Sequence, residues 1–346
     1  MAKVLIFNNF LTDGQESVLA PKSSKLHQYF SLGPGRWQAN PYAKGKHVGV
    51  KDLVRRFLMG LKLWFIWRKY DVLIVDTAIT ALIVSAFSLM GKWGHRIAVS
   101  NFNVPRHRTR FWKWLLGIFY RRVDHFFVHS TYDIHLSSEL YDLCEERFTY
   151  HPYLREAPTP GAPNDVYLFD DGRDYIMSFG GNARDYETFF RAIGGADLSA
   201  IVVARDYNLQ GLNVPDNVRA FCNIPLSECD KLVSQCLFTV FMFDGSEPSC
   251  GQISIVTSLM LAKPVICTDL TGVRDYVTDG QNGLLVETRD VEGLRGKMLQ
   301  LIKDRQLYDC LAAGARSWAK DNADPVRLRS KVDALVTELT SLPLKG

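Results

Sequence analysis

The sequence lacks several features that would each define a class of protein. Its seven cysteines are scattered and form no CxxC pair, which argues against a zinc site or a disulfide framework and fits a reducing compartment. It has no low-complexity tract, internal repeat or DxD-like metal motif, so neither a metal ion nor a resident cofactor is expected. No recognised DNA- or RNA-binding module occurs, so nucleic acid is not an expected partner. The N-terminus, MAKVLIFNNF, enters an apolar strand at once, and no signal peptide is expected.

One apolar run approaches the length that spans a bilayer. Residues 72–90, VLIVDTAITALIVSAFSLM, contain a single charge, Asp76. The run begins with β-branched residues, and Asp76 stands where a short strand would end. A strand, a turn and a helix of a parallel sheet have the same apolar content, and we prefer this interpretation to a transmembrane helix.

The remaining sequence predicts two α/β domains. A chain of 346 residues with 47% hydrophobic residues suits two cores of ordinary size. Short apolar strands alternate with helical stretches on both sides of EAPTPGAPN, residues 156–164, which has the composition of a linker. We therefore predict two doubly wound, Rossmann-like α/β domains in tandem, with a cleft between them. The expected parts are residues 1–160, residues 165–315, and C-terminal helices in 316–346 that pack back on the first domain.

Charge is distributed unequally between the halves. Residues 1–160 hold 22 Lys and Arg against 12 Asp and Glu, whereas the remainder holds 19 against 25. Six of the seven tryptophans precede residue 115. In 55–69 and 107–122, cations alternate with Trp, Phe and Tyr, which is compatible with helices that lie on an anionic membrane surface. The alternative is that these aromatic residues belong to the core and the cations are merely solvated.

Two polar, glycine-containing loops follow apolar strands in the second half. After LFTVFMF, a loop leads into a predicted helix whose first backbone N–H groups lack intrahelical partners, which suits a diphosphate. The residues around this helix start are Ser249, Cys250, Gly251, Gln252 and Ser254. After YIMSF, the loop contains Gly180, Gly181 and Arg184. Both loops would contact one ligand only if their strands were neighbours.

These segments carry a resemblance. IMSFGGNARDYETFFRAI, then SCGQISIVTSLMLAKPVICTD and TGVRDYVTDGQNGLLV, look like the nucleotide-sugar domain of GT-B glycosyltransferases, especially glycosyltransferase family 4. The resemblance implies that Gly180, Gly181 and Arg184 meet the donor diphosphate. It also implies that residues 221–224, with Asn223 and Ile224, hold the base, and that residues 249–254 hold phosphates and sugar. Arg205 would add positive charge.

One position departs from the family pattern. Many family members carry two glutamates eight positions apart here, the second of which binds the ribose hydroxyls. That second position is Thr257 in this chain, and Glu247 could stand for the first. Thr257 can still donate and accept a hydrogen bond, so we include both residues among the donor-binding candidates.

The resemblance also implies the reaction. We expect a metal-independent, retaining transfer of a sugar from a nucleoside diphosphate, UDP favoured, to a lipid-linked or glycan acceptor in bacterial surface polysaccharide assembly. The protein would be cytoplasmic and peripheral on the inner face of the membrane. Arg184 would stabilise the leaving diphosphate, while Asp76, His107 or Asp13 could act on the acceptor hydroxyl. An Asp at position 76 could equally be a helix cap. A nucleotide-sugar epimerase and a non-catalytic scaffold subunit are the alternatives.

Overall fold

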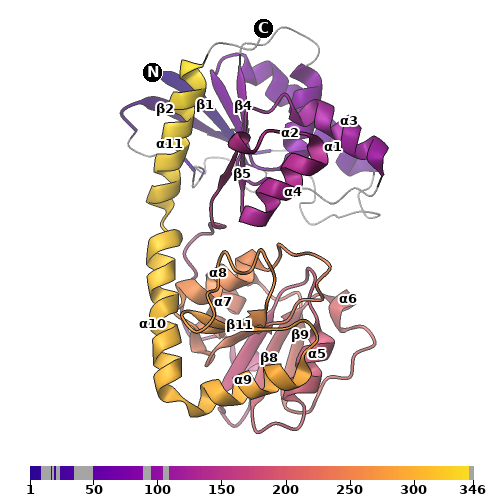
Figure 1. The fold of residues 1–346 in the computed structure, drawn as a ribbon, viewed down its shortest axis with the longest axis vertical. Coiled ribbons are helices and arrows are strands. Elements are labelled where there is room, and N and C mark those ends of the chain that lie inside the picture. Colours follow the sequence, from indigo (N-terminus) through magenta and orange to yellow (C-terminus); the bar gives the residue numbers. More distant parts are fainter. Residues whose placement is uncertain are drawn as a thin grey trace. The chain divides into compact units, whose positions relative to one another are not determined.

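The computed structural model describes residues 1–8, 17, 19–20, 24–34, 50–88, 95–103 and 109–342. Two compact units emerge: unit 1 comprises Met1–His151 with Pro325–Gly346, and unit 2 comprises Pro152–Asp324 (Figure 1). Each contains a six-stranded sheet in which every described strand pairing is parallel. The predicted pair of parallel α/β sheets is thereby confirmed.

The sheet of unit 1 has the strand order β2-β1-β3-β4-β5-β6. Its strands are β1 (Ala2–Phe7), β2 (His27–Leu32), β3 (Val72–Val75), β4 (Arg96–Val99), β5 (His125–Val128) and β6 (Phe148–Tyr150). The central strands β3, β4 and β5 are buried along their whole length, as expected where a parallel sheet is covered on both faces.

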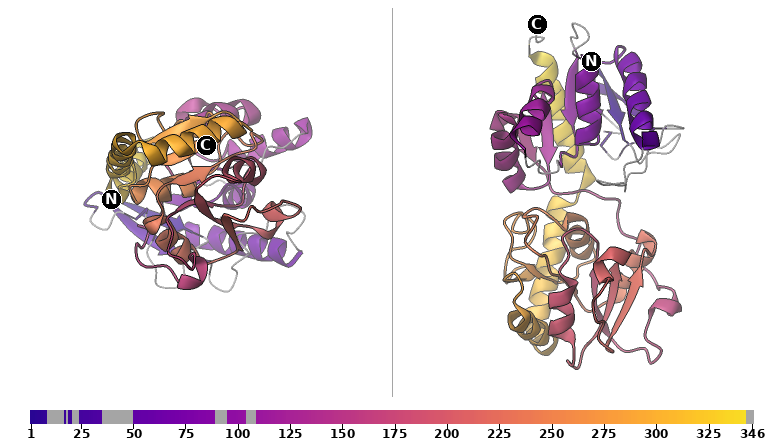
Figure 2. Two further views of the ribbon diagram at one scale, coloured as in Figure 1. Left: turned by 90° about the horizontal axis from the view of Figure 1, so that it is seen from below. Right: turned by 90° about the vertical axis from the view of Figure 1, so that its right-hand side faces the viewer.

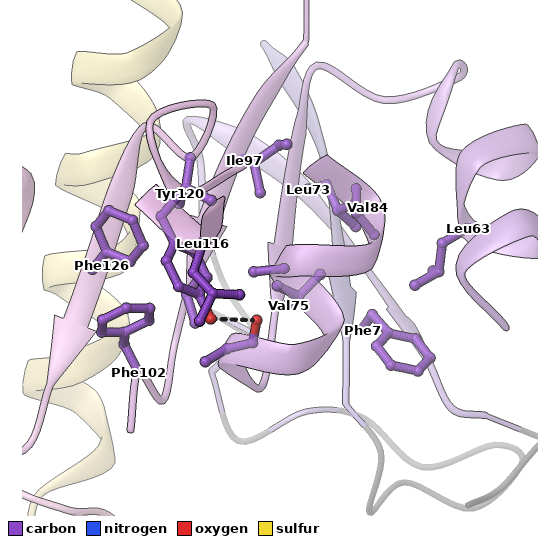
Figure 3. Close-up of a cluster of buried hydrophobic side chains, with 14 of the residues drawn as sticks. Phe7, Leu63, Leu73, Val75, Val84, Ile97, Phe102, Leu116, Tyr120 and Phe126 are labelled. Carbon is purple, nitrogen blue, oxygen red and sulfur yellow. Dashed lines mark hydrogen bonds between the residues drawn. The ribbon is translucent and has the colours of Figure 1, made fainter. Parts of the chain in front are cut away.

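Two layers of helices cover this sheet. Along β1 and β3, alternate residues such as Leu5, Phe7, Leu73 and Val75 join one core cluster with the helices that follow the strands (Figure 3). Those helices are α1 (Val50–Trp67), α2 (Ala78–Ser88), α3 (Arg110–Tyr120) and α4 (Thr131–Tyr141). The last helix, α11 (Pro325–Ser341), contacts β1 and β3, and its buried residues lie outside that cluster.

The described part of the apolar run, residues 72–88, forms a strand and a helix. Residues 72–75 are β3 and residues 78–88 are α2, which is only 11 residues long. Within the described ranges, no helix is both long and apolar enough to cross a bilayer.

The sheet of unit 2 has the order β12-β11-β10-β7-β8-β9. Its strands are β7 (Tyr175–Phe179), β8 (Ser199–Ala204), β9 (Val218–Cys222), β10 (Thr239–Phe241), β11 (Val265–Thr268) and β12 (Gly283–Val286). Read from β9, this is the 3-2-1-4-5-6 order of dinucleotide-binding folds.

Helices pack against both faces of this sheet (Figure 2). One core cluster contains α5 (Tyr186–Ile193) and α9 (Val291–Lys303). The other contains α7 (Leu226–Gln235), α8 (Gln252–Met260) and α10 (Arg305–Asn322). Short helical turns complete the description: η3 (Glu145–Arg147), η4 (Asp165–Tyr167) and α6 (Asp206–Leu209).

The chain passes between the units earlier than the composition of residues 156–164 suggests. That segment belongs to unit 2 because it is hydrogen-bonded along α7: Gly161 to Ser234, and Asn164 to Glu228. At the other end, α10 belongs to unit 2 and α11 to unit 1, so the second crossing falls at Asp324 and Pro325.

Candidate functional site

The candidate site of unit 2 lies where the strand order of its sheet reverses. From β7 the chain continues to β8 and β9 on one side, and it then returns to β10 on the other side of β7. The loops after β7 and β10 therefore leave neighbouring strands at the carboxyl edge of the sheet, the place where parallel α/β sheets bind ligands. The condition that the two glycine-containing loops come from neighbouring strands is met.

Main-chain hydrogen bonds join the two loops. The N–H of Asp185 donates to the carbonyl of Met242 (2.9 Å), and the N–H of Asp244 donates to the carbonyl of Ala183 (3.1 Å). These two bonds flank an antiparallel bridge between Arg184 and Phe243. The two loops, residues 180–185 and 242–251, are thus joined into one rigid unit at the sheet edge. We call this pair of loops the ledge.

The start of α8 lies against this ledge. Gly251 is its N-cap, with φ at 79°, a left-handed conformation that strains any residue with a side chain. A Cβ at this position would stand 2.2 Å from Cζ of Phe243 and 3.1 Å from Nη1 of Arg184. Only glycine fits here, and it leaves the first N–H groups of α8, which have no intrahelical acceptors, at the edge of the sheet.

The Arg184 guanidinium is packed beneath the ledge. Its Nε and Nη2 donate to the carbonyl of Phe179 (3.2 and 2.9 Å), and Nη2 also donates to Oγ of Ser254 (2.7 Å). Its Cζ lies 4.6 Å from the ring centre of Phe243 and 5.2 Å from that of Phe241. Burial lowers the pKa of Arg184, and its Nη1 is buried without a hydrogen-bond partner. Three hydrogen bonds of Arg184 thus hold the fold together. The remaining nitrogen, Nη1, is the one that lies beside Gly251.

A set of hydrogen-bonded polar residues joins the segments that follow β7, β8 and β9. The carbonyl of Gly181 accepts hydrogen bonds from Asn208 Nδ2 (3.0 Å) and the Tyr207 hydroxyl (3.3 Å). Nη1 of Arg205 donates to Oδ1 of Asn223 (2.9 Å). Both Arg205 and Asn223 are exposed, so this predicted cation and the predicted base-binding loop lie side by side at the surface of unit 2.

The remaining donor-binding candidates divide into accessible and buried side chains. Glu247 is exposed, while Ile224, Ser249 and Gln252 are half-buried; Gln252 Nε2 donates to Ser249 Oγ (3.1 Å). Cys250 is buried, which raises the pKa of its thiol to about 12. Its side chain packs in the core, and only its backbone remains for a ligand.

Two further candidates are buried and hydrogen-bonded inside the fold. The hydroxyl of Ser254 donates to the carbonyl of Phe179 and accepts from Arg184. Thr257 has no exposed surface; its hydroxyl donates to the carbonyl of Ile253 (2.7 Å) and accepts from Nη1 of Arg155 (2.6 Å). Both hydroxyls hold α8 in place, and their contact with a donor stays a prediction.

Several residues of this region escaped the sequence analysis. Phe243 supports Gly251 and stacks on Arg184, yet in the sequence it is only the last apolar residue of a strand pattern. Gly272, after β11, packs so closely on the ledge that a Cβ would stand 2.7 Å from Pro248 and Ser249. Arg155 and Asp230 meet across 75 positions of sequence, and no local pattern signals such a pair.

In unit 1, Asp76 also lies at the point where the strand order reverses. It follows β3, which neighbours β1, and its carboxylate is buried, with the Thr80 hydroxyl donating to Oδ1 (3.5 Å). Asp76 is not the cap of α2, because Thr77 has that role: its hydroxyl oxygen accepts from the N–H of Thr80 (3.3 Å). Asp13 and His107 lie outside the described residues.

The two basic aromatic stretches contain both core and surface residues. In α1, Met59, Leu63 and Trp67 are buried. In α3, Leu116 and Tyr120 face the core, whereas Phe111, Trp112 and Trp114 are 60%, 51% and 59% exposed. Arg110, Arg121 and Arg122 are exposed on or beside the same helix. In α1, Phe57 and Phe65 are exposed as well. The core interpretation thus holds for part of each stretch and fails for these two residues and for the start of α3.

Part of the chain is similar in sequence to known glycosyltransferases. Residues 205–318 match the family model described as "Glycosyl transferases group 1". A capsular polysaccharide biosynthesis glycosyltransferase of Staphylococcus aureus is 34% identical over 77 residues, which are 22% of this chain and 20% of that protein. An uncharacterized glycosyltransferase of Methanocaldococcus jannaschii is 35% identical over 65 residues, 19% of this chain and 18% of that protein. The chain thus spans about a fifth of the length of these curated relatives.

Solved structures agree over nearly the whole chain. Anabaena HepE in complex with UDP-glucose aligns with a TM-score of 0.69 and 14% identity, covering 99% of this chain and 100% of that one. Sucrose-phosphate synthase of Thermosynechococcus elongatus aligns with a TM-score of 0.66 and 14% identity, covering 97% and 89%. At such identities the similarity establishes the fold.

Residues 205–318 are therefore similar to a glycosyltransferase family, and the chain has a fold of two Rossmann-like domains. The predicted resemblance to GT-B glycosyltransferases is confirmed, for residues 205–318 by the family model and for the fold by the solved structures.

Proposed function

We propose that this protein transfers a sugar from a nucleoside diphosphate, with UDP favoured, to a lipid-linked or glycan acceptor in bacterial surface polysaccharide synthesis. The main support is the ledge at the reversal point of unit 2, where a buried guanidinium meets the start of α8, and α8 lies inside the segment that matches the glycosyltransferase family. The UDP-glucose bound to a protein of the same fold supports the choice of donor. The capsular role of the S. aureus relative supports the pathway.

The donor side must stabilise charge on the departing diphosphate. We assign this task to the N–H groups at the start of α8, to Nη1 of Arg184 and to the exposed Arg205. Fixed donors and cations that require no rearrangement stabilise developing charge effectively, and main-chain bonds fix the loop of Arg184 to the loop that leads into α8. Because these residues supply the positive potential themselves, we propose that the transfer needs no metal ion.

The acceptor side needs a group that can take a proton from a hydroxyl if the acceptor is activated by a base. Asp76 is the candidate with a described position, since it lies at the sheet edge and another residue caps the helix. We propose retention of configuration, as the resemblance implies. His107 remains a candidate on sequence alone.

We propose that α3 contacts the cytoplasmic face of an anionic membrane, so that the protein is peripheral to it. Three exposed aromatic side chains among four consecutive residues form an apolar patch, Phe111, Trp112 and Trp114, flanked by arginines. Tryptophan favours the lipid headgroup region, and each cation near an anionic leaflet adds about 1 kcal/mol.

The test is a transfer assay with the purified full-length chain. Radiolabelled UDP-glucose, UDP-galactose and UDP-N-acetylglucosamine are each incubated with a bacterial lipid extract, with and without EDTA. We expect label from one donor to enter the lipid fraction at a rate that EDTA leaves unchanged. Release of free sugar alone, or conversion of the donor without acceptor, would favour a hydrolase or an epimerase. No turnover of any donor and no UDP binding would contradict the proposal.

A further inference from the structure

Arg155 forms the most enclosed ion pair of unit 2 among the described residues. Its Nη1 donates to Oδ1 of Asp230 (2.8 Å) and its Nη2 donates to Oδ2 (2.6 Å). The guanidinium and the carboxylate therefore form a bidentate pair. Their side chains are 11% and 5% exposed. Nη1 also donates to the Thr257 hydroxyl (2.6 Å), and Nε donates to the carbonyl of Glu156 (3.1 Å). Arg155 therefore links three segments: the start of unit 2, α7 and α8.

Two arginines from other segments donate hydrogen bonds to side-chain hydroxyls on successive turns of α8. Arg184 donates to Ser254 (2.7 Å) and Arg155 donates to Thr257 (2.6 Å). These two hydroxyls are three residues apart, about 4.5 Å along the axis. The two contacts fix both the axial position and the rotation of the first turns, which include the N–H groups at the carboxyl edge of the sheet.

Stability alone is a weak explanation for such a pair. Replacing a buried ion pair by apolar residues is often neutral or stabilising, because the charges must lose their hydration. What the fork of an arginine adds is direction: a planar guanidinium that meets a carboxylate with two bonds has one orientation. Here the orientation aims Nη1 at Thr257.

We infer that Arg155, held by Asp230, is a positioning residue for the nucleotide-diphosphate site, acting on the start of α8 through Thr257. It touches no ligand itself. The inference rests on the proposed function in its final step, the effect on nucleotide binding. Its first step, the position of α8, concerns the protein without ligand.

The test compares Thr257→Val with Ser234→Ala. The first change removes one acceptor of Arg155 and keeps the volume of the side chain, while the Asp230 pair stays intact. The second change removes the hydroxyl of α7 that is hydrogen-bonded to Gly161. Gly161 belongs, like Arg155, to the start of unit 2, and this contact does not involve α8. We measure amide exchange of the first turns of α8 without ligand, UDP affinity by calorimetry, and the melting temperature.

We expect Thr257→Val to raise amide exchange in residues 252–256 and to weaken UDP binding about fivefold, a typical effect of a residue that acts through another. Arg155→Lys, which cannot make the fork, should do the same, and Ser234→Ala should do neither. Exchange in α8 and UDP affinity equal to wild type in Thr257→Val would overturn the inference, as would equal effects of both substitutions. If wild type itself binds no UDP, the proposed function fails, and the exchange of α8 still decides whether Arg155 positions this helix.

Discussion

The two units use similar sheets to present opposite charges where the strand order reverses. In unit 2, the strands β7 and β10 end in a ledge that holds a buried guanidinium and the start of α8. In unit 1, the corresponding neighbours are β1 and β3, and the described residue there is the buried carboxylate of Asp76. Positive potential suits a diphosphate, whereas a carboxylate suits a hydroxyl proton. Under the proposed function, this comparison favours unit 2 for the donor and unit 1 for acceptor activation.

The units also differ in the residues that respond to solution conditions. All eight histidines of the chain belong to unit 1, while six of the seven cysteines belong to unit 2. The exposed aromatic residues of α3 likewise belong to unit 1, whereas the candidate nucleotide site belongs to unit 2. Each difference can be tested by a substitution in one unit with the other unit as reference.

The largest effect is expected for Asp76→Asn. If Asp76 takes the acceptor proton, kcat should fall about a thousandfold, within the usual range for loss of a general base, while UDP affinity stays unchanged. Steady-state transfer rates and calorimetry check both parts. Thr77→Ala is the matched control: it removes the cap of α2, which should cost about 1 kcal/mol of stability, and should leave kcat near wild type. Similar rates for both variants would remove Asp76 from the mechanism.

The next largest effect is expected for Gly251→Ala, which tests whether this position requires glycine. Gly251→Ala puts a Cβ against the Phe243 ring, and we expect a loss of about 3 kcal/mol in the stability of unit 2 from overpacking and left-handed strain together. UDP binding should disappear with it. Gly245→Ala has the same backbone strain, with φ at 80°, but its Cβ would stand 3.7 Å from the nearest atom. It should cost about 1 kcal/mol and retain UDP binding. Equal losses in both variants would show that contact with Phe243 is unimportant.

Acid should destabilise unit 1 before unit 2. Burial lowers the pKa of His125 to about 4 and also lowers that of His129. A histidine with a lowered pKa binds fewer protons folded than unfolded, so its contribution to stability is complete above pH 6.5 and is lost as the pH falls towards 4. For His125 the loss at pH 5 is about 2 kcal/mol. Hydrogen exchange at pH 7.5 and 5.0 should show weaker protection in β4 and β5 than in β7 and β8, and His125→Gln should reduce the difference.

The smallest expected effect concerns the surface of α3. Trp112→Ser with Trp114→Ser should weaken binding to vesicles of anionic phospholipid about tenfold, with UDP affinity unchanged. Cosedimentation measures the binding. Trp318→Phe in unit 2 is the control for losing a tryptophan, since Trp318 packs on Tyr276 inside that unit. Vesicle binding that is indifferent to the α3 substitutions would place membrane contact elsewhere or exclude it.

The sequence predicted the two sheets and the two glycine-containing loops at the edge of one of them, because parallel strands appear as continuous apolar runs and their loops as glycine and polar residues. It did not show what surrounds single side chains. Ser254 and Thr257 look like ligand contacts because they follow a helix start, yet helix rotation buries both hydroxyls against arginines. Arg184 looks like a free cation, yet Phe241 and Phe243 enclose it. Contacts that join residues 70 or more positions apart leave no local pattern, so Arg155 and Asp230 could not be foreseen.

The most direct test of the central claim is amide hydrogen exchange of the wild-type protein with and without saturating UDP. The assignment of the donor to unit 2 predicts slower exchange in residues 180–185 and 243–254, with the strands of unit 1 unchanged. Protection confined to unit 1, or no change anywhere while UDP is bound, would contradict it.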